Sequence, residues 1–137
     1  MYKITTEPID ADAVYRAVDR ACDGAVVVFH GIVRERSDDG RDTRYLEYEA
    51  YPEMAEAQMR AIGEEIARRW GITDVAMVHR IGRCAIGEAS VVIAVASPHR
   101  GEAFDACKYA IDTLKASVPI WKKEVFADGE VWVGLQS

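Results

Sequence analysis

The stretch IWKKEVFADGEVWVGL, residues 120–135, decides the fold class of this chain. Two runs rich in β-branched and aromatic residues flank Asp128-Gly129, a dipeptide that favours the tight turn of a β-hairpin. The two strands of a hairpin are antiparallel. Upstream, helical and strand patterns interleave irregularly. We therefore expect an α+β fold with a mixed, mainly antiparallel sheet and about three helices, and not a doubly wound parallel sheet.

The spacing of apolar residues outlines the rest of the chain. The clearest helix covers residues 53–70, where Met59, Ile62, Ile66 and Trp70 recur at helical spacing. By the same criteria we expect strands at 2–8, 25–33, 45–51, 74–82 and 88–97, helices at 10–22 and 101–116, an exposed loop at 34–44 and a turn at 83–87. Since the chain shows neither repeats nor a linker, residues 1–137 are expected to form a single domain.

The composition excludes several classes of protein. A net charge of −6 argues against general nucleic-acid binding, which needs a dense basic surface. The apolar runs are too short to span a membrane, and no secretory signal is visible, so we expect a cytoplasmic location. Three widely spaced cysteines without a C-x-x-C pair argue against a disulfide framework or a zinc site. Glycine motifs that bind nucleotides are missing as well.

Two segments carry groups that can bind an anion. SPHRGEAF, residues 97–104, passes from an apolar strand into a helix, where free N–H groups and the helix dipole favour negative charge. His99 and Arg100 add donors at that point, although a capped helix start with two exposed basic residues explains the segment equally well. Arg34 ends an apolar strand at the start of a polar loop, and a surface arginine explains it better on its own.

The segment LKASVPIWKKE, residues 114–124, sets lysines on both sides of a bend. We expect Phe104, Cys107, Ile111 and Leu114 to form the buried stripe of the preceding helix, so that Lys115 lies beside its last buried turn. Lysines near a helix C-terminus also complement the dipole, and that explanation requires no function.

Beyond the bend, alternation along a strand separates neighbouring side chains. Val118-Pro119 forces the chain out of the helix, and Trp121 and Lys122 then point to opposite faces. If Trp121 faces the core, Lys122 and Glu124 share the other face, and Lys123 is excluded from it. A lysine that is partly desolvated or close to other cations can act as an acid, a base or a nucleophile.

The order of the segments resembles a known family. GAVVVFHGIVR, LEYEAYPEMAE, VAMVHRIG, SPHRGEAFDAC and LKASVPIWKKE follow one another as in the catalytic (large) subunit of molybdopterin synthase, the MoaE-like family. The resemblance extends from about Gly24 to Val133. Each motif alone is modest, but five motifs in register, with the W-K-K/R-E ending, are specific.

This resemblance implies an α/β hammerhead-type fold and a homodimer. Each copy would bind a small ubiquitin-like sulfur-carrier subunit, giving a heterotetramer, and the carrier's C-terminal Gly-Gly thiocarboxylate would enter a pocket of the large subunit. The implied activity is that of a sulfurtransferase in molybdenum cofactor biosynthesis. Two sulfurs pass to cyclic pyranopterin monophosphate to form the dithiolene of molybdopterin, with neither a metal nor another cofactor.

Site residues follow from the resemblance by position. Lys115 matches the family's essential lysine and Lys122 its second active-site lysine. Lys115 would act as general acid/base or as a transient nucleophile toward the carrier's carbonyl, and Lys122 would be its electrostatic partner, although the sequence does not separate these roles. The implied substrate-binding set is Arg34, His99, Arg100, Lys115, Lys122 and Glu124.

Two departures from the family pattern concern this site. The family often has a basic residue two positions before the strand-end arginine, where this chain has Ile32. The loop at 34–44 is also more charged than the family pattern suggests. Arg36, Arg41 and Arg44 are candidates to replace the missing cation.

Two other functions would use the same residues. A non-catalytic module that binds a ubiquitin-like tail would tolerate the loss of Lys115 and Lys122, and the presence of both lysines with Arg34 and Arg100 speaks against it. A lysine Schiff-base enzyme acting on a small carbonyl acid would leave a substrate adduct on Lys115 that borohydride can trap.

Overall fold

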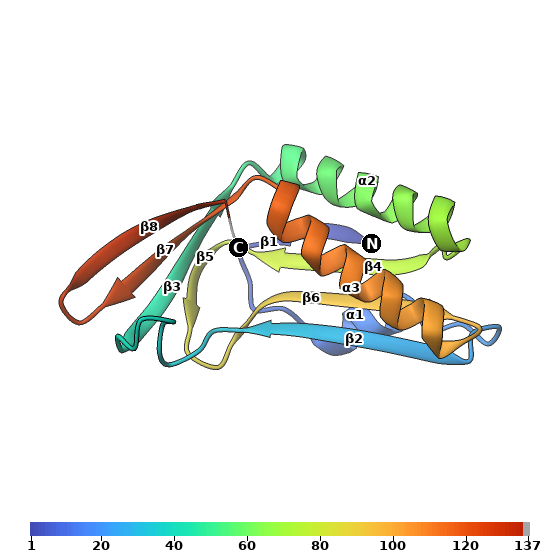
Figure 1. Cartoon of the computed structure of the whole chain (residues 1–137), viewed down its shortest axis with the longest axis horizontal. Helices are drawn as coiled ribbons and strands as arrows, with labels where there is room; N and C mark the ends of the chain where they lie inside the picture. Colours follow the sequence, from blue (N-terminus) through green and yellow to red (C-terminus); the bar gives the residue numbers. More distant parts are fainter. Residues whose placement is uncertain (136–137) are drawn as a thin grey trace.

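The computed structural model describes residues 1–135, with side chains to Trp132, and contains two four-stranded sheets (Figure 1). The first sheet consists of β1 (Tyr2–Thr5), β4 (Asp74–Arg80), β6 (Ala89–Ser97) and β2 (Ala25–Ile32), in that spatial order. β1 and β4 are parallel, and the other pairs are antiparallel. The sheet is therefore mixed and mainly antiparallel, as the sequence predicts.

Helices cover both faces of the first sheet. α2 (Pro52–Trp70) and α3 (Arg100–Ser117) lie on one face and the short α1 (Ala11–Arg16) on the other (Figure 1). α2 starts with Pro52 at its first position and is capped after Trp70 by Gly71, whose φ of 68° suits a glycine. None of the described helices is long and apolar enough to cross a membrane.

Two apolar clusters result from this arrangement. The larger one lies between the first sheet and helices α2 and α3, and the smaller one lies beneath α1. Representative fully buried side chains of the larger cluster are Met59, Ile66, Met77, Ile93 and Leu114. The larger cluster also reaches the second sheet through Tyr48, Cys84 and Ile120, and so ties the two sheets together.

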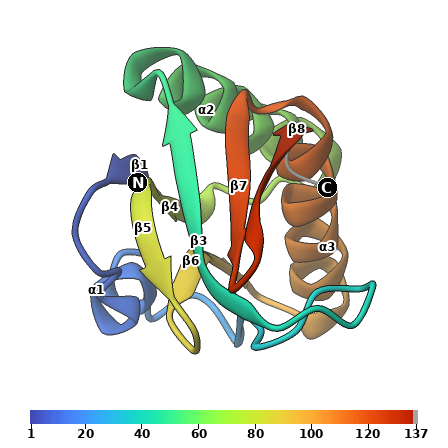
Figure 2. The same cartoon turned by 90° about the vertical axis from the view of Figure 1, so that its left-hand side faces the viewer.

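The second sheet stands at one end of the first and is antiparallel throughout. It consists of β5 (Gly82–Ala85), β3 (Thr43–Ala50), β7 (Ile120–Phe126) and β8 (Gly129–Leu135), in that spatial order (Figure 2). β7 and β8 form the predicted hairpin, with Gly129 at a φ of 146°. The α+β class and the three helices are confirmed.

Three local predictions were wrong. Residues 82–85 form β5, since they pair with β3, although residues 83–87 were expected to be a turn. The first helix ends at Arg16, and a tighter turn from Val18 to the carbonyl of Tyr15 follows it. Phe104 is 60% exposed, because small residues such as Ala103 and Ala106 form the face of α3 that packs closely on the sheet.

Candidate active site

A cavity of about 130 Å³ lies where the C-terminal end of α3 meets the inner face of the second sheet and the end of β2. We call this cavity the lysine pocket. Four of the six predicted site residues line it, namely Arg34, Lys115, Lys122 and Glu124. The other lining residues are Gly31, Ile32, Arg36, Ser37, Thr43, Leu46, Tyr48, Ser90 and Val91. Four cationic side chains against one carboxylate make the pocket suitable for an anion.

Lys115 is held at the pocket by the last turn of α3. The preceding Leu114 is buried, and its carbonyl accepts a hydrogen bond from the N–H of Val118, also buried, at 3.0 Å. These contacts fix the backbone on both sides of the half-buried lysine. Within the part of the chain that the structure describes, the Lys115 ammonium has no ion-pair partner. It is therefore available to a ligand.

Lys122 and Glu124 face the pocket from β7, as strand alternation predicts. Nζ of Lys122 lies 3.5 Å from Oε1 of Glu124, and the side chains are only 16% and 21% exposed. Lys123 points to the other face, where its ammonium lies 2.8 Å from a carboxylate oxygen of Glu47 and above the ring of Trp132. The bond to Glu47 raises the pKa of Lys123. Its exclusion from the pocket is confirmed.

Sequence reasoning missed the polar residues Tyr48 and Ser90. Tyr48 is the cross-strand partner of Lys122, and burial raises the pKa of its phenol to about 12, although a hydrogen bond with Ser90 opposes this. The Ser90 hydroxyl also donates to the carbonyl of Gly31 at 3.3 Å. Tyr48 therefore stays protonated at neutral pH and can donate a hydrogen bond. Its inward place in the alternating stretch YLEYEAY was the one available signal.

His99 and Arg100 lie elsewhere. They begin α3 at the far end of the first sheet, whereas Lys115 is near the end of the helix beside the second sheet (Figure 1). Fifteen residues of helix separate Arg100 from Lys115, which corresponds to about 22 Å. His99 lines a different cleft, together with residues such as Cys22 and Asp74. One chain therefore does not bring these two predicted residues to the lysine pocket.

That distant cleft contains a small cluster of groups that can bind a metal. Among the described residues, Cys22, Asp23 and Asp74 form the one group of three or more His, Cys, Asp or Glu side chains whose ligand atoms lie within 4.8 Å of one another. A hydrogen bond between the two carboxyl groups raises the pKa of Asp23, and Arg20 lies 3.3 Å from Asp74. The cluster does not contribute to the lysine pocket.

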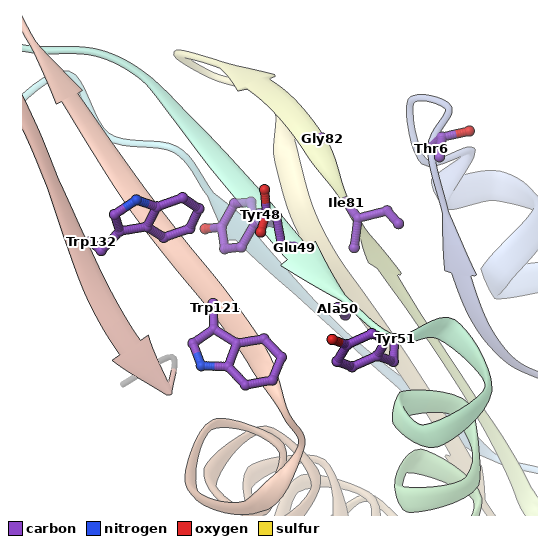
Figure 3. Close-up of a pocket in the computed structure, with 9 residues that line it drawn as sticks. All are labelled: Thr6, Tyr48, Glu49, Ala50, Tyr51, Ile81, Gly82, Trp121 and Trp132. Carbon is purple, nitrogen blue, oxygen red and sulfur yellow. The ribbon is translucent and has the colours of Figure 1, made fainter.

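A larger, mainly apolar groove opens on the outer face of the second sheet (Figure 3). It measures about 740 Å³ and is lined by Thr6, Tyr48, Glu49, Ala50, Tyr51, Ile81, Gly82, Trp121 and Trp132. The rings of Tyr51 and Trp121 meet edge to face, with centres 6.3 Å apart. Glu49 is the one acidic or basic residue among those that line it, so this groove offers mainly apolar surface, whereas the lysine pocket gathers charged side chains.

The fold and the lysine pocket define a small two-sheet α+β protein with two lysines and two arginines around one cavity. The MoaE protein family model matches residues 4–117. The molybdopterin synthase catalytic subunits of Halalkalibacterium halodurans and Bacillus subtilis are 48% and 47% identical over 135 residues, which is 98% of this chain and 86% and 85% of theirs. The solved molybdopterin synthase from Staphylococcus aureus superimposes with a TM-score of 0.92 at 47% identity, covering 97% of this chain and 96% of that one. The chain belongs to the MoaE family.

A more distant solved structure has the same fold. It is the complex of subunits 1 and 2 of the molybdopterin-converting factor from Helicobacter pylori, with a TM-score of 0.77 at 24% identity. The alignment covers 96% of this chain and 88% of that one.

Proposed function

We propose that this chain is the catalytic subunit of a molybdopterin synthase, active as a single domain in the cytoplasm. It transfers sulfur from a small thiocarboxylated carrier subunit to cyclic pyranopterin monophosphate and so forms the dithiolene of molybdopterin. The observation that carries the proposal is the convergence of Lys115 and Lys122 on one arginine-rimmed pocket in a MoaE chain.

The two lysines differ in their surroundings, and this difference suggests different roles. Lys115 has no ion-pair partner in the described part of the chain, so it is the better candidate for general acid/base or for transient attack on the carrier's carbonyl. Lys122 is oriented by Glu124 and would supply positive charge where the reaction develops negative charge. Opening a cyclic phosphate and expelling oxygen requires both contributions.

Arg34 would hold the phosphate at the mouth of the pocket, since a guanidinium forms paired hydrogen bonds to phosphate oxygens. His99 and Arg100 can contact the same substrate only if a second copy of the chain delivers them, because α3 separates them from the pocket of their own chain. This requirement agrees with a homodimer, which we propose as the core of a heterotetramer with two carrier subunits.

Reconstitution of the purified chain with a thiocarboxylated carrier and cyclic pyranopterin monophosphate tests the proposal. We expect molybdopterin to form, and we expect Lys115→Ala to lower turnover by about 100-fold to 10,000-fold, the range for general acid–base groups. Lys108→Ala is the matched control on the same helix, because Lys108 is 79% exposed and pairs with Asp112 at 2.7 Å, away from the pocket.

The outcome also separates the alternatives. Full activity of Lys115→Ala would refute the role of this lysine. A chain that binds the carrier but forms no molybdopterin would be a binding module, and a borohydride-trapped substrate on Lys115 would indicate Schiff-base chemistry. The folded state of Lys115→Ala is expected to persist, since alanine favours helix and the lost dipole interaction amounts to about 0.3–1 kcal/mol.

A further inference from the structure

The segment between β2 and β3 folds into a closed hairpin. The N–H of Thr43 donates to the carbonyl of Glu35 at 2.9 Å, and the N–H of Ser37 donates to the carbonyl of Arg41 at 3.0 Å. Between these bonds, Arg36 and Asp42 form an antiparallel bridge. The backbone therefore holds Arg36 at a defined position beside the lysine pocket.

Arg41 attaches this hairpin to the β7–β8 hairpin. Its guanidinium lies 2.6 Å from a carboxylate oxygen of Asp128 and stacks on Phe126, with its central carbon 3.8 Å from the ring centre. Figure 2 shows the segment after β2 passing below the turn between β7 and β8. Since β7 also carries Lys122 and Glu124, the hairpin between β2 and β3 is attached to the same sheet as these two pocket residues.

Of the three arginines that could replace the cation missing at Ile32, only Arg36 lines the pocket among the described residues. Arg41 pairs with Asp128 and stacks on Phe126, and Arg44 is exposed and is not among the residues that line the cavity. Ile32 lines the same cavity and is 47% exposed. The position that lacks a cation and the arginine that can supply one therefore border the same space.

Arg36 can bind an anion with little loss of stability, because the ion pair that it would give up is exposed. Its Nε lies 3.4 Å from a carboxylate oxygen of Asp42, and the two side chains are 71% and 81% exposed. Such exposed pairs contribute little to stability. Arg34 is in the same situation, 3.0 Å from the exposed Asp38. A phosphate can accept paired hydrogen bonds from both guanidiniums, whereas Asp38 and Asp42 each pair with only one of them.

We propose that Arg36 and Arg34 together clamp the phosphate of the substrate over the lysine pocket, and that Arg36 replaces the cation missing at Ile32. This inference rests on the proposed function for the identity of the substrate. Arg36 is a binding residue in this arrangement, and Lys115 and Lys122 keep the roles proposed above.

The test uses steady-state kinetics of the full reconstituted enzyme with cyclic pyranopterin monophosphate. Arg36→Ala should raise KM by about 10-fold to 100-fold, as expected for the loss of hydrogen bonds to a charged group, and change kcat by less than about 3-fold. Arg36→Lys should recover only part of the loss, because an ammonium lacks the paired geometry. Arg44→Ala is the matched control and should leave both constants unchanged.

A rescue experiment separates binding from a structural role. Ile32→Lys introduced into Arg36→Ala should bring KM back toward the wild-type value, since it supplies a cation to the same cavity, whereas damage to the hairpin would not be repaired. An unchanged KM in Arg36→Ala, or the absence of any rescue, would overturn the proposal.

The two proposals fail in different ways. If the wild type forms no molybdopterin, the proposed function fails, and titration with inorganic phosphate followed by NMR still tests the clamp. Arg36→Ala must then weaken phosphate binding, and equal binding by the variant and the wild type would refute the clamp. If the wild type is active and Arg36→Ala behaves identically, only the clamp fails.

Discussion

Tyr48 makes the interior of the lysine pocket accessible to a quantitative test. The residue is 4% exposed, and burial raises the pKa of its phenol from 10.0 to about 12. Above pH 10 the unfolded chain releases this proton more readily than the folded one, so stability falls as the pH rises through 12. The difference between the two pKa values corresponds to about 3 kcal/mol, which is fully present below pH 10.

Substitution of Tyr48 by phenylalanine should therefore destabilise the protein near neutral pH and stabilise it at high pH. Near neutral pH, Tyr48→Phe is expected to cost about 1 kcal/mol, because the hydrogen bond with Ser90 is lost. Since the variant has no phenol to titrate, the two stability curves should cross at about pH 11, and the variant should be the more stable protein at about pH 12. Denaturant unfolding at a series of pH values measures both curves.

Tyr45→Phe is the control for this measurement. Tyr45 lies on the outer face of the same strand, where the guanidinium carbon of Arg83 is 3.6 Å from its ring centre. Its stability curve should not cross that of the wild type. If the stability curves of Tyr48→Phe and the wild type run parallel between about pH 9 and about pH 12, the Tyr48 phenol is not buried as described, and the reasoning is refuted.

Two further predictions concern the packing of α2 and the loss of stability at acid pH. A Cβ at Gly63 would overlap the ring of Tyr2. Gly63→Ala should thus destabilise the wild type by about 1–2 kcal/mol. In a Tyr2→Ala background the same substitution should be stabilising, because only the helix preference of alanine, about 1 kcal/mol, remains. If thermal unfolding shows that Gly63→Ala changes the stability in the same direction in both backgrounds, this packing is contradicted. Hydrogen bonds from the N–H of Ala85 and from Arg80 lower the pKa of Glu88 below 4.5. The Glu88 carboxylate therefore contributes fully to the stability of the fold above pH 4.5, and this contribution is lost in acid. Glu88→Gln should be less stable than the wild type at neutral pH, and the difference in unfolding free energy should become smaller as the pH falls below 4.5. Urea titrations that give the same difference at every pH would contradict this role of Glu88.

Local patterns in the sequence determined much of the fold and part of the site. The Asp128-Gly129 turn predicted the last hairpin, and helical spacing predicted α2, because both signals depend on neighbouring residues only. Strand alternation placed Lys122 and Glu124 on one face of β7 and Lys123 on the other, because the period of a strand is independent of what packs against it. These are properties that the chain carries in any tertiary context.

Only the tertiary structure decided which of these local features share a cavity. Tyr48 reaches the lysine pocket by pairing across strands with Lys122, a contact between residues more than seventy positions apart. Arg36 faces the pocket, while Arg41 and Arg44 do not, because one bridge and one ion pair orient the hairpin. Motifs that are adjacent in the family pattern can therefore lie far apart, as the length of α3 separates Arg100 from Lys115. The physical reason is that strand pairing and helix length set distances between segments, and a linear sequence pattern does not contain those distances.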